Sequence, residues 1–373
     1  MSLARRELPP FVDYVVLPAV NVITAFAAAG LVVLAIGENP IEVVKIMIVG
    51  ALGNAENIGY TLYYTTNFIF TGLSVAVAYH AGLFNIGPEG QSTVAGIGVA
   101  LVCLAFDGAP WWLVLPFAVA ASVIFGAGWA LIPAWLQARR GSHIVITTIM
   151  FNFLAATLIV YLLVNVMGKA GSMATETRML TDATRLPFFA TLLKPFGIDL
   201  GQSPVNPSFL IAIVASVAVW LLVWHTRLGY EIRTVGTNSQ AAVYAGIDPA
   251  RIIIIAMLIS GGLSGLLAVN EVMAVQGRLL IDVAQGAGFV GIAVALMGRS
   301  HPLGIALAAF LFGILYQGGA ELGFDIPKIT RDMIVVIQAL VILFAGALGN
   351  MYRPMLERIF ARRPAARAHE AEA

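Results

Sequence analysis

Three polar side chains stand close together in the stretch HAGLFNIGPEGQ, which lies between two long apolar segments. They are Asn85, Glu89 and Gln91. Amides and a carboxylate can hydrogen-bond a polar solute, because together they offer donors and acceptors. A carboxylate within lipid costs about 2.5–3.5 kcal/mol, so Glu89 is expected to face protein or water.

Polar side chains also interrupt the apolar segments elsewhere in the chain. Each of them alone could make an interhelical hydrogen bond. Taken together, they offer amides and hydroxyls but few charges, which suits a neutral, hydroxyl-rich substrate better than an ion. The predicted substrate pathway consists of Asn67, Asn85, Glu89, Gln91, Asn152, Asn270 and Glu271.

Aromatic side chains near the first of these polar positions allow two interpretations. They could stack on a planar base, or they could anchor the chain at the membrane interface. These side chains are Tyr60, Tyr63, Tyr64 and Phe68.

The glycines and the proline of residues 80–91 predict how the chain turns there. Pro88 suits the first turn of a helix, so one helix is expected to end near His80 and another to begin near Pro88. Asn85 could cap the second helix, and the helix dipole would favour Glu89 in its first turn. A cytoplasmic turn and an element of a transport pathway both fit this pattern. A re-entrant turn that dips into the helix bundle would satisfy both.

No catalytic or metal-binding motif occurs in the sequence. There is no GxxxxGK[ST] loop and no HExxH, and the five histidines are scattered. The single cysteine, Cys103, lies in an apolar run, which excludes an intramolecular disulfide and a cysteine-based metal site. The chain is therefore predicted not to be an enzyme and to hold no cofactor. If transport is driven by ATP, a separate subunit must bind ATP and Mg²⁺.

The composition indicates which elements position these residues. Of the 373 residues, 60% are hydrophobic and 11% are charged, and the mean hydropathy is +0.90. A soluble domain carries about 25% charged residues, so lipid must solvate most of this exterior. The net charge of +1 gives no reason to expect a nucleic-acid partner. We predict an all-α integral membrane protein, because backbone amides in lipid must be hydrogen-bonded within the helix.

About ten segments are candidate transmembrane helices, each of which needs roughly 20 residues. With ten crossings, 13 of the 21 basic residues fall on the side of both chain ends, which the positive-inside rule identifies as the cytoplasm. This predicts a multi-pass protein of the cell inner membrane. The segments are residues 11–36, 57–79, 91–107, 111–136, 143–167, 208–225, 252–275, 286–298, 302–320 and 331–349.

In this topology residues 1–373 form a single transmembrane domain. It has a cytoplasmic loop at 226–251, an extracytoplasmic loop at 168–207 and a basic cytoplasmic tail at 350–373. Residues 38–56 are expected to form an amphipathic helix at the outer interface. The first segment could instead be a cleaved signal peptide, but its apolar core is longer than that of a signal sequence.

Two pairs of similar strings suggest an inverted repeat. GLS occurs at residues 72–74 and 262–264, and GIGVAL at 96–101 resembles GIAVAL at 291–296. Such strings also recur by chance in apolar chains. The copies are five spans apart, so they would cross the membrane in opposite directions. We predict that spans 2–5 and 7–10 form the repeat, with the polar interruptions on a pathway between the halves.

The longest cytoplasmic connection in this topology reads TRLGYEIRTVGTNSQAAVYAGIDPAR. Asn238 or Ser239 is expected to cap a short helix, residues 240–245, which Gly246 ends. The alanines of this helix and Tyr244 could enter a groove on a partner protein. The alternative is a plain loop on the membrane surface.

The motifs AGLFNIGPEGQ (81–91), GSHIVITTIMFNF (141–153) and LGYEIRTVGTNSQAAVYAGI (228–247) resemble the membrane permease subunits of bacterial ABC importers. The most similar branch transports nucleosides and simple sugars and is related to ribose-type permeases. The resemblance covers roughly residues 60–350. It implies an ATP-binding cassette ATPase in the cytoplasm, an extracytoplasmic solute-binding protein or lipoprotein, and a second permease subunit, identical or, as the resemblance favours, a paralogue.

The resemblance also implies roles for particular residues. The segment that couples the permease to its ATPase would include Gly236, Asn238, Ala241, Ala242 and Gly246. The NIGPEGQ stretch matches a segment beside the translocation path of ribose-type relatives, although Pro88 replaces the small residue that relatives often have. The expected function is import of a nucleoside or related purine or pyrimidine compound by alternating access.

Other functions are weighed against this expectation. A simple-sugar ABC permease is the alternative, although the resemblance implies that sugar importers differ in the NIGPEGQ segment. An ion-coupled secondary transporter would usually need buried ionisable residues, which are nearly absent within the spans. A membrane-embedded enzyme lacks a catalytic constellation, and a structural scaffold would not need the polar interruptions.

Overall fold

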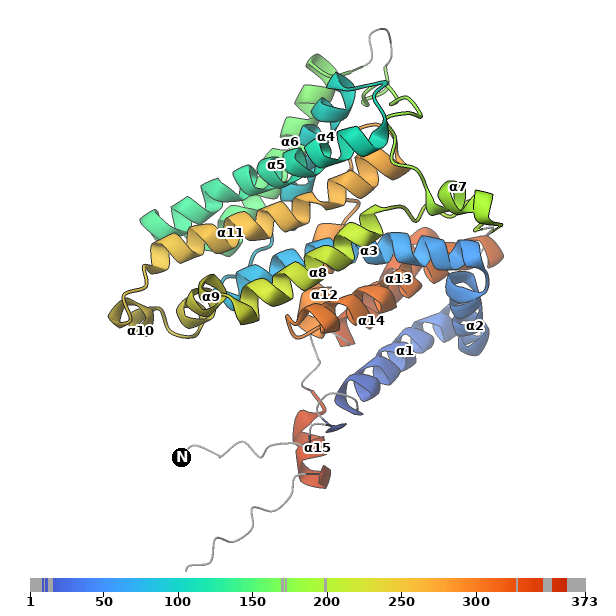
Figure 1. Cartoon of the computed structure of the whole chain (residues 1–373). Coiled ribbons are helices and arrows are strands. Elements are labelled where there is room, and N and C mark those ends of the chain that lie inside the picture. The colour runs from blue at the N-terminus through green and yellow to red at the C-terminus, as the bar shows by residue number, and fades with distance from the viewer. Residues whose placement is uncertain are drawn as a thin grey trace, which may run out of the picture. The chain divides into compact units, whose positions relative to one another are not determined.

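A computed structural model describes residues 9, 11–12, 16–168, 171, 173–197, 200–326, 328–344 and 351–360. Within these residues the chain is helical and contains no β-strand, so the predicted all-α class is confirmed (Figure 1). The basic pair Arg5 and Arg6, residues 345–349 of the last predicted span, and residues 350 and 361–373 of the predicted tail lie outside this description.

Helices follow one another along the described chain with short connections. The longest connection joins α6 to α8 and holds two short helical turns, α7 (Phe189–Leu193) and η2 (Lys194–Phe196). The other helices are α1 (Leu17–Ile36), α2 (Pro40–Leu52), α3 (Ala55–His80), α4 (Pro88–Ala105), α5 (Trp111–Arg140), α6 (Ile144–Asn165), α8 (Ser208–His225), α9 (Arg227–Thr237), α10 (Ser239–Tyr244), α11 (Pro249–Gly265), the π-helix η3 (Val269–Val275), α12 (Ala287–Met297), α13 (Pro302–Asp325), α14 (Arg331–Ile342) and α15 (Arg353–Phe360).

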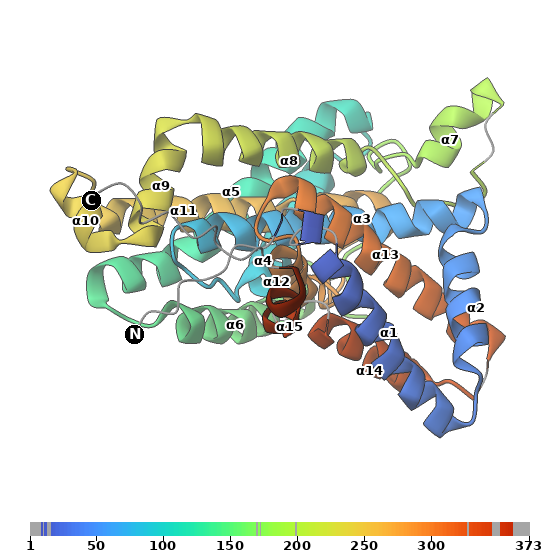
Figure 2. The same ribbon diagram turned by 90° about the horizontal axis from the view of Figure 1, so that it is seen from below.

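The helices divide into two units, which are described separately. The smaller unit comprises residues 1–44 and 326–373. In it α1 packs against α14 (Figure 2). An ion pair of 3.0 Å joins Lys328, before α14, to Glu38, after α1.

The larger unit, residues 45–325, is a bundle in which α3 packs against α8, α11, α12 and α13. The α11 helix lies along α5 (Figure 1), and α5 also packs on α4. Backbones approach closely at the α5–α11 crossing. A Cβ added to Gly126 would lie 2.3 Å from the Gly261 carbonyl oxygen, and one added to Gly265 would lie 2.3 Å from that of Ser122. Only glycine permits this distance.

Six helices among the described residues are long and apolar enough to cross a membrane. They contain residues 19–36, 111–140, 144–165, 208–225, 249–275 and 302–325. The other four predicted spans also coincide with helices, namely α3, α4, α12 and α14. The α12 helix has 11 residues and is about 16 Å long, about half of a hydrocarbon core of ~30 Å. The number of about ten crossings therefore stays a prediction.

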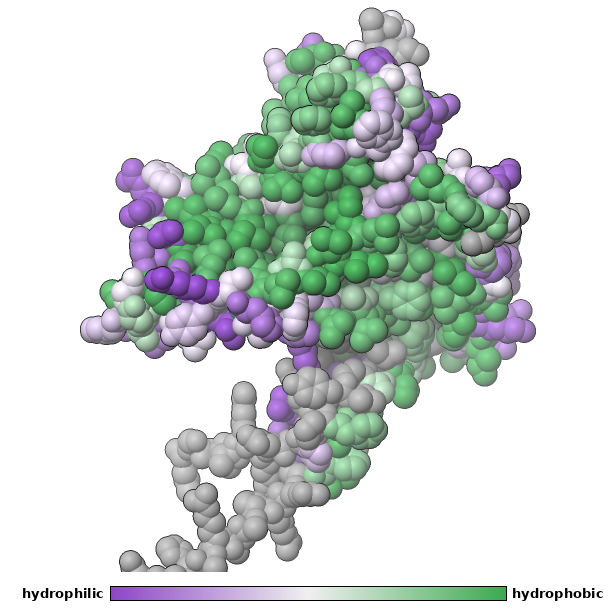
Figure 3. Space-filling model, in the orientation of Figure 1, coloured by the Kyte–Doolittle hydropathy of each residue, from purple (hydrophilic) through white to green (hydrophobic). Residues whose placement is uncertain are grey.

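Apolar side chains cover the outside of the larger unit. Figure 3 shows a broad hydrophobic band over its helices, with hydrophilic residues gathered at the end where α9 and α10 lie. Trp112, Phe153 and Leu307 are more than 60% exposed. Such a surface is unfavourable in water and suits contact with lipid.

Candidate functional site

The polar stretch 80–91 is a buried turn between two helices. The α3 helix ends at His80, Gly82 adopts a φ of 74°, and α4 begins at Pro88, as predicted. The prediction that Asn85 caps α4 is wrong. The N-cap residue is Gly87, without a side-chain cap, and the Asn85 Oδ1 instead accepts a hydrogen bond of 2.8 Å from the Gly87 N–H. The side-chain nitrogen of Asn85 bonds residues of α4 and α11.

Asn85 and Gln91 belong to a buried polar cluster between α3, α4 and α11, here called the Asn85 network. The Asn85 Nδ2 donates to the Ser260 Oγ at 2.9 Å and to the Gln91 Oε1 at 3.2 Å. Ser264 donates to the same Gln91 oxygen at 3.1 Å, and the hydroxyls of Ser74 and Ser260 are 3.0 Å apart. The network consists of neutral groups that satisfy one another.

Glu89 joins α4 to α12. Its two carboxylate oxygens accept hydrogen bonds from the backbone N–H groups of Gly286, at 2.9 Å, and Gly288, at 2.8 Å. These N–H groups lie at the start of α12, where a helix leaves donors unpaired and carries partial positive charge. A Cβ on Gly288 would lie 2.3 Å from the Glu89 nitrogen, so the starts of both helices touch. We call this contact the Glu89 clasp.

A second polar cluster, the Glu271 network, joins α3 to the π-helix η3. The Glu271 Oε1 accepts hydrogen bonds from the Tyr63 hydroxyl at 2.5 Å and from the Asn67 Nδ2 at 2.7 Å. The Asn67 Oδ1 accepts a bond of 2.8 Å from Asn270, whose Oδ1 accepts one of 2.7 Å from Asn206. Among the predicted pathway residues, Asn67 thus meets Asn270 and Glu271, which lie about 200 positions further along the chain.

Asn152 is the remaining predicted pathway residue, and it fixes the turn rather than either network. Its Nδ2 donates to the Ile86 carbonyl oxygen at 2.8 Å, and its Oδ1 accepts from the Gly90 N–H at 2.9 Å. It thereby holds the start of α4 against α6. The seven predicted residues are brought together in these separate groups, not in one ring around a single cavity.

The four aromatic residues divide into two pairs. Tyr64 and Phe68 pack with Tyr316 of α13, at ring-centroid distances of 5.7 and 4.9 Å, and so belong to the core. Tyr60 and Tyr63 line a cavity of about 510 Å³ together with residues of 188–204. The cavity reaches the Glu271 network through Tyr63.

Several members of the networks were not singled out from the sequence. They are Tyr63 as a partner of Glu271, and Ser74, Asn206, Ser260, Ser264 and Gln285. One signal was present for two of them. Ser74 and Ser264 are the serines of the paired GLS strings, and both lie in the Asn85 network.

The turn between α3 and α4 contacts both ends of α12. At one end, the His80 Nε2 is 3.1 Å from the Ser300 carbonyl oxygen, and at the other Glu89 bonds Gly288. The helix between them is about 16 Å long, and residues 83–87, which are not helical, can extend over about the same distance. Glu89 and His80 therefore contact opposite ends of α12.

The predicted short helix in the loop 226–251 is present as α10. The Asn238 Oδ1 caps it by accepting hydrogen bonds of 3.0 Å from the Gln240 and Ala241 N–H groups. The helix starts one residue earlier than expected, and Gly246 follows it with a φ of 76°. The preceding helix α9 was not expected, and its presence excludes the plain-loop alternative.

This segment touches the turn after α3. A Cβ on Gly236 would lie 2.1 Å from the His80 carbonyl oxygen and 2.8 Å from the Gly82 nitrogen. Ala242 is fully buried in an apolar cluster with Ala78, Ala81 and residues of α9 and α11. Tyr244, in contrast, is 95% exposed. A force applied to α10 therefore has a packed path to residues 80–91.

Residues of the loop 168–207 clamp the opposite end of the bundle. Asp107, after α4, accepts hydrogen bonds from Arg178 and from the backbone and side chain of Thr181. Loss of surrounding water opposes ionisation, but these hydrogen bonds outweigh it and lower the pKa of Asp107 to about 2. The same loop bonds η3 and the segment after it, where the Thr177 and Leu180 N–H groups donate to Leu279 and Gly277.

The described residues hold no cluster of three or more metal-ligating side chains. A helical bundle with an apolar exterior and buried, mostly uncharged polar networks defines a multi-pass membrane transport protein of the permease class. The chain belongs to the family of the permease component of the branched-chain amino acid transport system, whose family model matches residues 57–346. It is a permease component of the inner membrane and not an enzyme.

Relatives with assigned functions match over most of the chain. It is 33% identical to the glucose ABC transporter permease protein TsgB13 of Haloferax volcanii, over 91% of this chain and 89% of that protein. It is 34% identical to the nucleoside ABC transporter permease protein NupB of Lactococcus lactis, over 88% and 90%. It is 32% identical to the guanosine ABC transporter permease protein NupP of Bacillus subtilis, over 90% and 94%.

Proposed function

We propose that this chain is the transmembrane permease subunit of an ATP-driven importer for a nucleoside or a related purine or pyrimidine compound. The observation that carries the proposal is the packed connection from α10 through residues 80–82 to the Asn85 network and the Glu89 clasp. It links an exposed docking element to polar groups within an apolar bundle. The family match and the nucleoside permease relatives support the same function.

The proposed topology has ten crossings, with both termini and α9–α10 in the cytoplasm. The distribution of basic residues supports this orientation. The proposed inverted repeat pairs α3 and α4 with α11 and α12, which carry the matching strings. The packing between the halves supports this pairing. The α3 helix of the first half packs on α12 and α13 of the second, and α11 of the second half packs on α4 and α5 of the first.

Alternating access follows from this arrangement. ATP-driven closure of the ATPase pair would move α10, and Gly236 would pass that movement to His80 and Gly82. The starts of α4 and α12, held together by Glu89, would then shift as one body between the two halves. The networks keep their polar groups hydrogen-bonded during this motion, so little unpaired polar surface meets lipid.

The proposed partners are a cytoplasmic ATP-binding cassette ATPase carrying ATP and Mg²⁺, a second permease subunit of paralogous sequence, and an extracytoplasmic solute-binding protein or lipoprotein. Tyr244 and Val243, 95% and 58% exposed, suit the docking of α10 in a groove of the ATPase. The clamped loop 168–207 forms part of the proposed extracytoplasmic side.

A sugar is the second candidate substrate, because a glucose permease is among the relatives. The cavity beside Tyr60 and Tyr63 favours a nucleoside, since an aromatic base can stack on tyrosine rings. Glu271 is buried, and its hydrogen bonds to Tyr63 and Asn67 support a structural role in this proposal.

The test is uptake into proteoliposomes that contain the complete complex of permeases, ATPase and binding protein. We expect ATP-dependent uptake of guanosine that excess glucose does not compete with. If glucose is taken up and guanosine is not, the sugar function is assigned instead. Uptake without the ATPase, driven by an ion gradient, would overturn the proposal in favour of a secondary transporter.

A further inference from the structure

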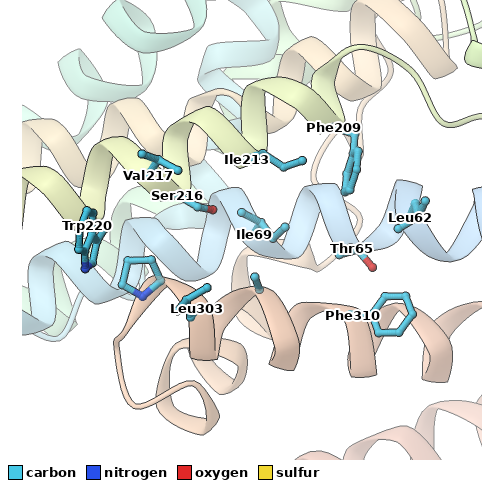
Figure 4. A pocket seen from close by; sticks show the side chains of 12 residues that line it. Leu62, Thr65, Ile69, Phe209, Ile213, Ser216, Val217, Trp220, Leu303 and Phe310 are labelled. Atoms are coloured by element: carbon cyan, nitrogen blue, oxygen red, sulfur yellow. The ribbon is translucent and has the colours of Figure 1, made fainter.

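An apolar groove runs along the outside of the larger unit between α3, α8 and α13 (Figure 4). Its volume is about 500 Å³. Figure 4 shows Phe209, Ile213 and Val217 of α8 on one side, Ile69 of α3 at its floor and Leu303 of α13 on the other side. None of the residues that line the groove belongs to the Asn85 network.

The groove cannot recognise a polar substrate. Its two hydroxyl groups are already used within their own helices, because Thr65 donates to the Thr61 carbonyl oxygen at 2.7 Å and Ser216 to that of Ala212 at 2.8 Å. The other lining side chains are apolar, apart from the indole N–H of Trp220 at one end. An occupant must therefore be hydrocarbon along most of its length.

The length of the groove suits an acyl chain. Residues 209–220 of α8 flank the groove and extend over about 16 Å. A single acyl chain is thin enough to lie within it.

Amphipathic and basic groups gather at the Trp220 end of the groove. The Trp220 ring is 4.3 Å from the His225 ring, and the Trp224 ring is 5.0 Å from that of His301, which precedes the lining residue Pro302. Tryptophan rings are typical of the lipid head-group region.

Arg227 lies two residues beyond His225, and its side chain is 93% exposed. Glu231 accepts a hydrogen bond of 3.1 Å from the Arg227 Nε. A guanidinium carries five N–H donors in all. A basic side chain at a membrane surface attracts anionic lipid, so the charge at this end complements a phosphate.

We propose that the groove binds one acyl chain of an anionic phospholipid, whose phosphate lies at the Trp220 end beside His225 and Arg227. The leaflet that supplies the lipid is the cytoplasmic one, which rests on the topology proposed above. The lipid would lie over α3 between α8 and α13 and so support the helix that carries Tyr63 and Asn67.

Native mass spectrometry of the complete transport complex tests the binding. The complex is exchanged into phosphatidylglycerol or phosphatidylcholine, and retained lipid is counted. Ala306→Phe should expel one lipid, because Ala306 lines the groove. Leu307→Phe is the matched control on the same helix, since Leu307 is 74% exposed and does not line the groove. Equal retention by both variants would overturn the proposal.

The head group is tested separately. Arg227→Gln should lower the preference for phosphatidylglycerol over phosphatidylcholine about fivefold, the ratio that ~1 kcal/mol produces. An unchanged preference would overturn the anionic assignment. Brominated acyl chains give a measurement that needs no substitution in the groove wall. They should quench tryptophan fluorescence in the wild type, and Trp220→Phe should remove most of that quenching.

The remaining outcomes identify other occupants. If Ala306→Phe separates the two permease subunits without changing retained lipid, a helix of the second subunit occupies the groove and the lipid proposal is wrong. Guanosine uptake is assayed on the same samples. Loss of the bound lipid with uptake of another substrate would leave the lipid site standing while refuting the proposed substrate.

Discussion

Glu89 shows how one carboxylate can join the starts of two helices. Its oxygens accept two backbone N–H groups from the start of α12. Hydrogen bonds to charged groups contribute about 1.5–3 kcal/mol each. Removing the carboxylate would leave both N–H groups without this acceptor. The role of Glu89 is therefore to hold two helix ends in register.

Glu89→Ala should lower the free energy of unfolding by about 3 kcal/mol or more, because both hydrogen bonds are lost. Transport should fall, whereas the ATPase should still co-purify with the permease. Glu89→Gln keeps the shape and one acceptor oxygen, so its loss of stability should be smaller. Thermal unfolding in detergent and uptake assays measure these effects. Failure of the ATPase to co-purify would instead place Glu89 at the cytoplasmic interface.

Tyr63 is expected to stabilise the protein through its hydrogen bond to Glu271. Tyr63→Phe removes one hydrogen bond to the buried Glu271 and should destabilise the protein by about 1.5–3 kcal/mol. Tyr60→Phe is the control, because no described hydrogen bond of the Tyr60 side chain is lost and both residues line the same cavity. Equal stability of the two variants would show that the Tyr63–Glu271 contact contributes nothing.

The α5–α11 crossing depends on backbone contact between helices. Gly265→Ala would place a Cβ 2.3 Å from the Ser122 carbonyl oxygen, so the helices must move apart. We expect a strongly reduced melting temperature and yield. Gly128→Ala is the matched control within α5, because no atom lies within 4 Å of its Cβ, and it should be neutral or stabilising. Similar losses in both variants would contradict the packing described here.

The coupling segment contains two glycines with different requirements. Gly236→Ala pushes a Cβ against the His80 backbone, and we expect uptake to fall about tenfold, equivalent to ~1.4 kcal/mol, while ATP hydrolysis persists. Gly246 has open space around its Cβ but a φ of 76°. Gly246→Val should therefore uncouple through backbone strain, whereas Gly246→Asn should be tolerated. Unchanged uptake in Gly236→Ala would remove α9 from the coupling path.

At the scale of the whole molecule, the orientation in the membrane can be measured with single cysteines. Cys103 is buried, so Cys103→Ala gives the background. Tyr244→Cys should react with an impermeant maleimide only in inside-out vesicles. Met173→Cys, at a fully exposed position of the loop 168–207, should react only in right-side-out cells. The reverse pattern would refute the proposed topology and the coupling role of α10.

Most of the helices could be predicted from the sequence, because helix formation depends on local hydrogen bonds and on apolar runs. Every predicted span coincides with a helix, and the turn at Pro88 and the cap at Asn238 lie where turn and cap residues indicated. The α9 helix was missed because its apolar residues are few and form one narrow face. The α12 helix coincides with the predicted span 286–298, and hydropathy does not reveal whether its 11 residues cross the membrane.

Only the tertiary structure decided which polar groups meet. Glu89 bonds residues about 200 positions away, and Asn85 bonds Ser260 instead of capping its own helix. A carboxylate or an amide has the same donors and acceptors in any neighbourhood, so its type does not specify its partner. Packing of the small residues at the helix crossings fixes those neighbours, and with them the division of the predicted pathway into separate networks.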